Sequence, residues 1–470
     1  MANVVIIGGG PGGYEAALVG RQLGGKVTLV DPRPIGGAAT LTDVVPSKSL
    51  IATAEVMTRV RSSHELGLVP VDPNLADLKD AVRVDLASIN KRLLGLAAQQ
   101  SQDIESRLLH EGVTIIRGRG RLLDNDTVFA TAEDGEIRRL QADMVLVATG
   151  TRPRELPEAL PDGERILTWT QLYNLTELPD RLIVVGSGVT GAEFAGAYNQ
   201  LGVDVVLVSS REQVLPTQDP DAARVLQDVF EASGMTIMSR SRAQSARRIG
   251  DRVELTLADG RTVVGSHLLM AVGSLPNTES LGLVENRVQL TPSGHIKVDR
   301  MSRTTARGVY AAGDVTGVFP LASVAAMQGR IAVWHALGDA VQPLDLRSIS
   351  SNVFTAPEIA NVGVTQTQVD AGEVAVRTVQ VPLRGNARAK MQAHHDGFVK
   401  LFCLPTTGII VGGVVVAPGA SELIYAVSLC VSARLTVDQA ARAFTIYPSL
   451  SGSISEAGRR LHSPGGSVDH

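Results

Sequence analysis

The strongest constraint on the fold is a glycine-rich turn that occurs twice, each time after a short apolar strand and before a helix. The first copy lies between Asn3 and Asp31, and Asp31 ends its second strand. Glycines in such a turn let backbone N–H groups approach a pyrophosphate at the helix N-terminus. Because strand, turn, helix, second strand and terminal acid follow in order, the segment predicts a dinucleotide-binding unit whose Asp31 accepts hydrogen bonds from a ribose. The turn residues are Gly8, Gly10, Pro11, Gly12 and Gly13.

The second copy begins at Arg181, but its second strand does not end in an acid. Ser209, Ser210 and Arg211 stand there instead. A carboxylate at this place binds the 2′-hydroxyl and repels a 2′-phosphate, whereas Ser and Arg do the reverse. The sequence therefore favours NADPH or tolerance of both nicotinamide cofactors, unless Arg211 merely points to solvent. The turn residues are Gly186, Gly188, Val189 and Gly191.

Residues 36–48 read G-G-A-A-T-L-T-D-V-V-P-S-K. This stretch resembles the redox-active helix of the flavoprotein disulfide reductases, the class I pyridine nucleotide-disulfide oxidoreductases that include lipoamide dehydrogenase. That family carries G-G-x-C-x-x-x-x-C-x-P-S-K, and here Gly37 and the Pro-Ser-Lys end match. The two cysteine positions hold Ala39 and Val44. Neither side chain forms a thiolate, so disulfide exchange and lipoamide dehydrogenase activity are not expected.

Three further stretches, residues 148–150, 271–277 and 309–314, extend the resemblance over nearly the whole chain. Residues 309–314 match the family's second FAD motif, whose Asp contacts the ribityl chain and precedes a helix pointing at the flavin. The resemblance thus implies FAD at the first glycine turn and the nicotinamide at the second. The residues it assigns to FAD, besides the first turn, Asp31 and Gly37, are Lys48, Ala148, Thr149, Gly150, Gly313, Asp314 and Ala322. The resemblance assigns Gly273 to the nicotinamide dinucleotide; this residue lies in the return crossing of residues 271–277, where Ser274 replaces the usual Arg.

The implied fold is α/β, with two Rossmann-like nucleotide-binding domains and an α+β C-terminal dimerisation domain. We expect the FAD domain at residues 1–155 and 276–345, the NAD(P) domain at 156–275 and the dimerisation domain at 346–470. In the family this last domain makes an obligate two-fold dimer, and each active site uses both chains. The partner is therefore expected to be a second copy, as a homodimer or a dimer of dimers.

The resemblance also suggests which residues act. Lys48 and Glu193 match a pair that meets beside the flavin N5, so reduction of FAD by the nicotinamide is expected to remain. The family's catalytic His position holds Tyr447, whose phenol has a reference pKa near ~10 and is a poor base at neutral pH. The Glu that follows is replaced by Gly452, unless a four-residue insertion brings Glu456 to that place.

With the disulfide apparatus gone, we expect an FAD-dependent NAD(P)H:quinone oxidoreductase, as in the quinone reductase branch of lipoamide dehydrogenase-like proteins. A planar quinone fits a pocket lined by Ala39 and Val44, and Tyr447 of the partner chain is expected to donate a hydrogen bond to it. Two alternatives stay open: a soluble pyridine nucleotide transhydrogenase, and a catalytically quiet FAD-binding dimer.

Charge and composition narrow the partners. The net charge of -4, without a basic block, argues against nucleic acid. No apolar run approaches the length of a membrane span, and the N-terminus enters its glycine turn too early for a signal peptide. Two cysteines in 470 residues fit a reducing cytoplasm, and Cys403 and Cys430 are expected to be buried packing residues. No cysteine lies at metal-ligand spacing, so no metal is expected.

Overall fold

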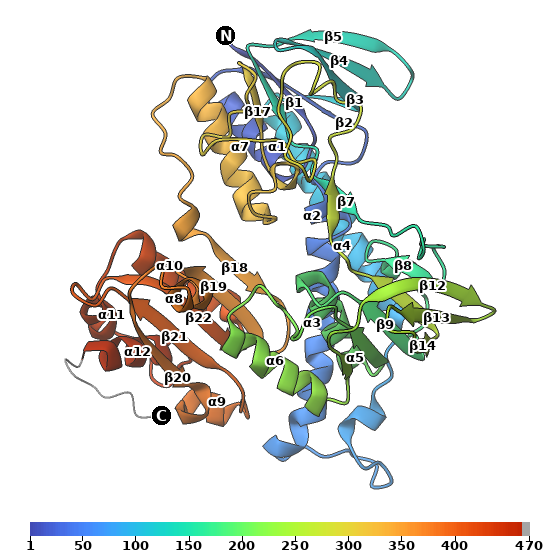
Figure 1. Cartoon of the computed structure of the whole chain (residues 1–470), viewed down its shortest axis with the longest axis vertical. Helices are drawn as coiled ribbons and strands as arrows, with labels where there is room; N and C mark the ends of the chain where they lie inside the picture. Colours follow the sequence, from blue (N-terminus) through green and yellow to red (C-terminus); the bar gives the residue numbers. More distant parts are fainter. Residues whose placement is uncertain (463–470) are drawn as a thin grey trace. The chain divides into compact units, whose positions relative to one another are not determined.

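The computed structural model describes residues 1–462, which form two compact units, each assembled from several segments of the chain (Figure 1). The first unit consists of Met1–Ser49, Ser88–Arg154 and Gly273–Asp345. The second consists of Leu50–Ala87, Glu155–Val272 and the segment from Leu346 onward.

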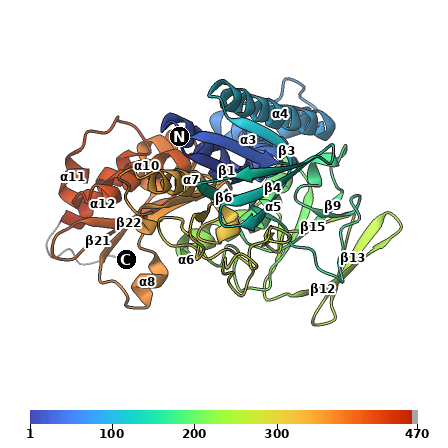
Figure 2. The same ribbon diagram turned by 90° about the horizontal axis from the view of Figure 1, so that it is seen from above.

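The first unit is built around a seven-stranded sheet in the order β17-β6-β1-β2-β3-β4-β5, and Figure 2 labels β1, β3, β4 and β6 of this sheet. The strands from β17 to β3 are parallel, and β4 and β5 continue the sheet as an antiparallel hairpin. Val4 and Ile6 of β1 enter one core cluster, and Val5 and Ile7 enter another. Apolar residues on both faces are typical of a parallel strand covered on each side. The strands are β1 (Asn3–Ile7), β2 (Lys26–Asp31), β3 (Thr114–Asp124), β4 (Thr127–Ala132), β5 (Ile137–Gln141), β6 (Met144–Val147) and β17 (Val309–Ala311), with a separate pair β7 (Thr151–Pro153) and β16 (Ser274–Pro276).

Helices α1 (Pro11–Gln22) and α7 (Ala322–Ala336) lie side by side in this unit (Figure 1). Their backbones come so close that a Cβ on Gly329 would clash with the carbonyl of Gly12. Glycine at both places therefore brings the second FAD motif next to the first turn. The other helices that lie in or begin in this unit are α2 (Gly37–Leu41), α3 (Val44–Ser62), most of α4 (Leu86–His110) and the 3-10 turn η4 (Asp314–Thr316).

The second unit contains a five-stranded parallel sheet in the order β11-β10-β9-β15-β8. It carries helices α5 (Val189–Leu201) and α6 (Pro220–Ala232). Helix α5 begins at Val189, directly after Gly188, which serves as its N-cap. The strands are β8 (Ile166–Thr168), β9 (Arg181–Val185), β10 (Asp204–Val208), β11 (Thr236–Met238) and β15 (His267–Met270), beside an antiparallel sheet of β12 (Ala243–Ile249), β13 (Arg252–Leu257) and β14 (Thr262–Gly265).

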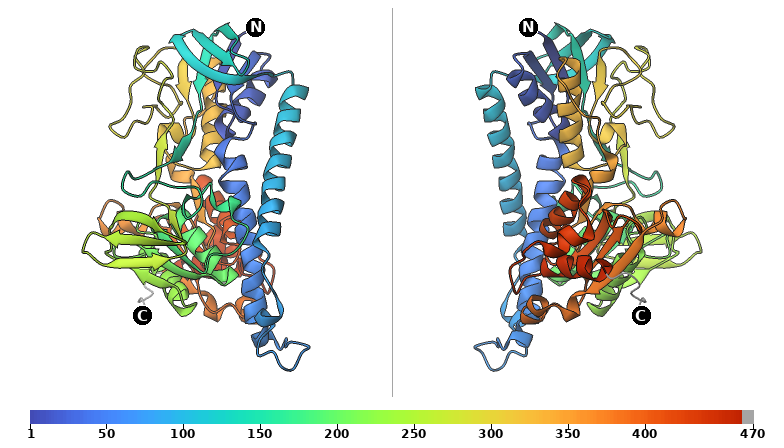
Figure 3. Two further views of the ribbon diagram at one scale, coloured as in Figure 1. Left: turned by 90° about the vertical axis from the view of Figure 1, so that its right-hand side faces the viewer. Right: turned by 90° about the vertical axis from the view of Figure 1, so that its left-hand side faces the viewer.

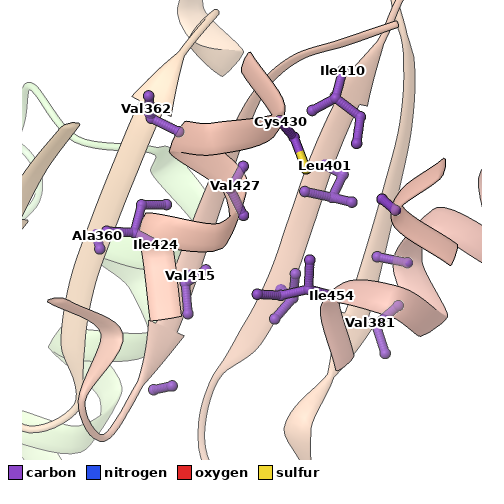
Figure 4. Packing of buried hydrophobic residues seen from close by; sticks show 14 of the residues in the cluster. Ala360, Val362, Val381, Leu401, Ile410, Val415, Ile424, Val427, Cys430 and Ile454 are labelled. Atoms are coloured by element: carbon purple, nitrogen blue, oxygen red, sulfur yellow. The ribbon is translucent and has the colours of Figure 1, made fainter. Parts of the chain in front are cut away.

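The C-terminal part of the second unit is an antiparallel sheet in the order β18-β19-β22-β21-β20. Helices α10 and α12 lie on one face of it, red against orange in Figure 3, and α11 packs on α12. Figure 4 shows the hydrophobic core between the sheet and these helices, where Cys430 of α10 points at strand residues such as Leu401. Cys403 and Cys430 are both buried, which confirms the expected packing role. The elements are β18 (Ser350–Val353), β19 (Glu358–Gly363), β20 (Arg377–Pro382), β21 (Phe398–Cys403), β22 (Ile410–Ala417), α8 (Gln366–Asp370), α9 (Ala387–Met391), α10 (Ala420–Ser432), α11 (Val437–Arg442) and α12 (Gly452–His462).

Among residues 1–462, no helix has both the length and the apolar character needed to cross a bilayer. Within the same range, no group of three or more His, Cys, Asp or Glu side chains is arranged to hold a metal ion.

Candidate functional site

The first glycine turn brings the backbone close to where a ligand would bind. Gly8 has a φ of 110°, and any Cβ on Gly13 would collide with the Gly8 carbonyl. Gly10 is the N-cap of α1 and Pro11 is its first residue, so the helix begins directly at this turn. A Cβ on Gly37 would lie 2.6 Å from the Gly10 Cα. Side chains are therefore excluded from the floor of the cleft, as a bound pyrophosphate requires.

A cleft opens above this turn, lined by residues from every segment that the sequence assigned to FAD. Asp31 is only 3% exposed, and its carboxylate accepts hydrogen bonds from the backbone N–H groups of Gly9 at 2.7 Å and Arg33 at 2.8 Å. These bonds fix the carboxylate at the edge of the cleft. The lining consists of Gly10, Pro11, Gly12, Asp31, Arg33, Gly37, Ala38, Ala39, Asp43, Val44, Ala148, Thr149, Gly150, Thr151, Ala312, Gly313, Asp314, Pro320, Ala322 and Ala325.

Asp314 is an acid of this cleft whose pKa is raised. Burial, reinforced by the negative charge of Asp43, raises the pKa of Asp314 to about 6, although the Thr151 hydroxyl donates a hydrogen bond to it at 3.5 Å. Burial acts this way because it disfavours the charged form. The backbone before it is also fixed, since Gly313 N–H donates to the side-chain oxygen of Gln328 at 2.8 Å. A buried acceptor of this kind suits the hydroxyls of a ribityl chain.

Ala39 and Val44 line this same cleft, although they lie on different helices. The predicted redox-active helix is in fact broken: α2 ends at Leu41 and α3 begins at Val44. The backbone of Asp43 bridges the break, receiving a hydrogen bond from Ser47 N and donating one to Ala38 O. Where a disulfide would stand in the resembling family, the wall is apolar, with one carboxylate beside it.

The second glycine turn repeats the geometry of the first. Gly186 also has a φ of 110°, Gly188 is the N-cap of α5, and a Cβ on Gly191 would collide with the Gly186 carbonyl. Among residues 1–462, no atom outside the adjoining backbone lies within 4 Å of a Cβ built on Gly188 or Gly273. The surface above this turn is therefore open, as a second dinucleotide requires.

The candidate cofactor-binding residues after β10 include more than Ser209, Ser210 and Arg211, the three that the sequence predicted. The hydroxyl of Ser209, which is buried, lies 2.7 Å from that of Ser187, and it also accepts from Arg211 N at 3.0 Å. The Arg211 side chain is exposed, and the backbone carbonyl of Arg211 accepts a hydrogen bond from Arg240 N at 2.8 Å. Arg240 pairs with the carboxylate of Glu212. Two guanidinium groups thus come from neighbouring backbone segments, and sequence reasoning missed Arg240 because it lies beyond the next strand, β11.

Lys48 and Glu193 are on α3 and α5. Glu193 is buried, and its carboxylate accepts a hydrogen bond from Phe354 N at 2.9 Å. Nothing in the sequence pointed to Phe354, which follows β18. The pairing of Glu193 with Lys48 stays a prediction.

Tyr447 is 86% exposed and lines a groove of the C-terminal segment together with Arg384, Glu456 and Arg460. The turn that carries it is held by Asn386, whose side chain donates to Ser449 O and Ser453 Oγ at 2.9 Å each. Hydrogen bonds from Arg459 and Arg460 lower the pKa of Glu456 to about 2. Glu456 lines the same groove as Tyr447, but a carboxylate with so low a pKa is a weak general base.

Comparison with known proteins supports this reading of the two turns. A family model described as "Pyridine nucleotide-disulphide oxidoreductase" matches residues 2–329, and the dimerisation domain of the same family matches residues 349–458. A protein of Mycobacterium tuberculosis named "NAD(P)H dehydrogenase (quinone)" is 53% identical over 470 residues, covering 98% of this chain and 94% of that protein. A dihydrolipoyl dehydrogenase of Chlamydia trachomatis is 32% identical over 463 residues, covering 97% of this chain and 96% of its own length.

The fold is equally close to a solved structure. The crystal structure of LpdA from Mycobacterium tuberculosis superposes with a TM-score of 0.93 at 52% identity, covering 98% of this chain and 100% of that one. The α/β architecture with two Rossmann-like domains and a dimerisation domain is thereby confirmed.

Proposed function

This chain belongs to the pyridine nucleotide-disulphide oxidoreductase family, and we propose that it is an FAD-dependent NAD(P)H dehydrogenase that reduces a quinone instead of a disulfide. Members of the family bind FAD and use NAD(P)H, and their dimerisation domain implies a homodimer. FAD, when bound, supplies the capacity to accept a hydride and pass two electrons on.

The observation that carries this proposal is the wall of the first cleft at Ala39 and Val44. A thiolate at either place would be needed to exchange with a disulfide, and neither side chain has one. An apolar wall beside the flavin site instead suits a planar, largely apolar acceptor. The name of the mycobacterial relative, at 53% identity, supports the same acceptor class.

Each cofactor is assigned to one turn and its own set of side chains. FAD would be held by the backbone of the first turn, by Asp31 at the ribose and by Asp314 at the ribityl chain, all of which lie at the first cleft. The roles assigned to the remaining lining residues, Gly37, Ala148, Thr149, Gly150 and Ala322, are those the sequence predicted, with Thr149 fixed by a hydrogen bond from its hydroxyl to Asn277 O at 2.7 Å. Lys48 and Glu193 are proposed to serve reduction by the nicotinamide.

The nicotinamide dinucleotide is assigned to the second turn, with NADPH used at least as well as NADH. Ser209 and Ser210 offer hydroxyls in place of the expected carboxylate, and Arg211 offers a cation. Arg240 is proposed as a second cation for a 2′-phosphate, in competition with its present partner Glu212.

The FAD domain is proposed to span residues 1–155 and 276–345, the NAD(P) domain 156–275 and the dimerisation domain 346–470. Tyr447 is exposed and carries a phenol able to donate a hydrogen bond. We assign it to the quinone site of the partner subunit, where it would hold a quinone oxygen rather than act as a base.

The decisive experiment is an anaerobic two-step reaction in a stopped-flow instrument. The enzyme is first reduced by one equivalent of NADPH, then mixed with menadione, thio-NAD or lipoamide, and flavin absorbance is followed. We expect fast re-oxidation by menadione, no turnover with lipoamide and no long-wavelength band from a thiolate beside the flavin. Fast re-oxidation by thio-NAD with inert menadione would instead identify a transhydrogenase, and failure of NADPH to reduce the flavin would identify a quiet binding protein.

A further inference from the structure

The loop that joins β10 to α6, residues 209–219, carries Arg211 near its start. Its middle is held against the second glycine turn, because Leu215 N donates to the carbonyl of Ser187, a residue of that turn, at 2.8 Å. At the start of the loop, the hydroxyl of Ser209 lies 2.7 Å from the hydroxyl of the same Ser187. The turn is thus tied to the loop at two points.

Leu215 has an unusual backbone for its residue type. Its φ is 51°, in the left-handed region that favours glycine, and the residue is only 1% exposed. A buried leucine keeps such a backbone only where its surroundings force it, and residues of this kind cluster at binding and catalytic sites. The contacts on both sides of Leu215 therefore matter for the shape of the loop.

The far end of the loop is anchored to the sheet of the C-terminal segment. Gln218 N donates to Leu215 O at 3.0 Å, and the Gln218 side chain accepts a hydrogen bond from Asn361 Nδ2 of β19 at 2.7 Å. The next residue, Asp219, accepts hydrogen bonds from Lys400 of β21 at 2.8 and 3.0 Å. A continuous series of hydrogen bonds therefore runs from β19 through the loop to the second glycine turn.

Both ends of the Asn361 amide are engaged. Its oxygen accepts a hydrogen bond from Ser351 Oγ of β18 at 3.1 Å, while its nitrogen donates to Gln218. Rotating the amide would break both hydrogen bonds, so the donor to the loop is fixed in direction. Asn361 belongs to residues 349–458, which match the dimerisation domain of the family, and so comes from outside the nicotinamide-binding segment.

We propose that Asn361 is a positioning residue of the nicotinamide site, which through Gln218 holds the loop where Arg211 can meet a 2′-phosphate. This inference rests on the proposed assignment of the nicotinamide dinucleotide to the second turn and deepens it. The affinity for NADP⁺ then depends on a side chain of the C-terminal sheet. The affinity for NAD⁺ depends on that side chain less, because NAD⁺ lacks the phosphate assigned to Arg211.

The test measures equilibrium binding of NADP⁺ and NAD⁺ to the oxidised, FAD-loaded enzyme by isothermal titration calorimetry. We expect Asn361→Ala to raise the Kd for NADP⁺ about two- to tenfold, the range that one hydrogen bond contributes. The Kd for NAD⁺ should rise less. The ratio of the two dissociation constants is the readout, because a general loss of structure would weaken both ligands alike.

Two further variants separate the hydrogen bond from the fold. Gln218→Ala removes the other partner of the same bond, and the double variant should bind NADP⁺ no more weakly than either single variant, because one interaction cannot be lost twice. Gln380→Ala is the matched control, since it removes an exposed amide side chain from β20, the opposite edge strand of the same sheet. FAD content per chain and the melting temperature verify that each variant is folded and loaded.

The inference is overturned if Asn361→Ala leaves the ratio of dissociation constants unchanged, if the effects of Asn361→Ala and Gln218→Ala add in the double variant, or if Gln380→Ala changes the ratio as much. None of these results touches the assignment of the dinucleotide to the second turn. That assignment, and the inference with it, fails if wild-type enzyme binds neither NADP⁺ nor NAD⁺. The quinone reductase function is decided separately, by re-oxidation of the reduced flavin with menadione.

Discussion

Replacing Lys400 by methionine should destabilise the second unit strongly. Lys400 lies on β21 and is almost fully buried, but it is not part of the core cluster that its neighbours Val399 and Leu401 join. Its ammonium donates to both oxygens of Asp219 at 2.8 and 3.0 Å and to Asp221 at 2.6 Å. Met keeps the length of the side chain and removes the charge, so the change isolates the electrostatic contribution.

The size of the destabilisation follows from the buried carboxylate that loses its cation. Asp219 is only 3% exposed at its side chain, so its carboxylate would stay buried without a cation. Breaking a buried pair in this way costs about 3–5 kcal/mol. The N-terminus of α6 reduces this loss of stability, because the N–H groups of Asp221 and Ala222 still donate to Asp219 at 3.0 and 3.2 Å. Asp221 is 39% exposed and adds less, because water screens its charge.

Differential scanning calorimetry would measure the effect, with Lys390→Met on the exposed surface of α9 as the matched control. We expect the transition of the second unit to fall by on the order of 5–15 °C for Lys400→Met, and hardly at all for the control. Adding Asp219→Asn should restore part of the loss, because Asn removes the buried charge and keeps an oxygen for the cap.

The pH dependence gives a second check. Although burial pushes the pKa of Asp221 upward, the hydrogen bond and charge of Lys400 hold it below 3.8 in the folded protein. The stability gained through Asp221 is therefore present above that pH and is lost as the pH falls below it. The gap between wild type and Lys400→Met should narrow in strong acid. A variant within about 1 kcal/mol of wild type at neutral pH would refute the reasoning.

Three further predictions concern the two cofactor sites. Arg211→Glu should cost about 1.5–3 kcal/mol of NADPH binding, raising the KM for NADPH roughly tenfold or more while leaving NADH nearly unchanged; equal effects on both cofactors would count against the assignment. Val44→Trp should slow re-oxidation of the reduced enzyme by quinone and spare its reduction by NADPH in stopped-flow traces, and an unaffected quinone step would place the acceptor elsewhere. Because the pKa of Asp314 is raised from 3.8 to about 6, chiefly by burial, its ionisation destabilises the FAD-free fold as the pH rises through that interval. Asp314→Asn should therefore stabilise FAD-stripped protein above pH 6 but not below pH 3.8, and equal melting shifts at both pH values would contradict this.

Residues close in sequence were predicted well. Both glycine turns, their helices and Asp31 follow from spacing alone, because a strand, a tight turn and a helix N-terminus are made by consecutive backbone groups. The loss of thiol chemistry at Ala39 and Val44 is likewise a property of residue type.

Contacts between distant segments were not predicted. Phe354 donates to Glu193 across 161 residues of sequence, and Lys400 meets Asp219 across 181. Arg240 comes beside Arg211 only because β10 and β11 are neighbours in the sheet. The residue pattern of one segment does not predict its contacts with a distant segment.

The sequence by itself determined where the two glycine turns and their helices lie, which residue types stand at the two cysteine positions of the family, and the class of fold. The tertiary structure decided which side chains share a cleft: that Asp43 and Asp314 lie near enough to influence each other, and that Glu456 is held by two arginines. The physical reason is that local backbone geometry depends on neighbouring residues, whereas burial and the field at a carboxylate depend on every segment packed around it.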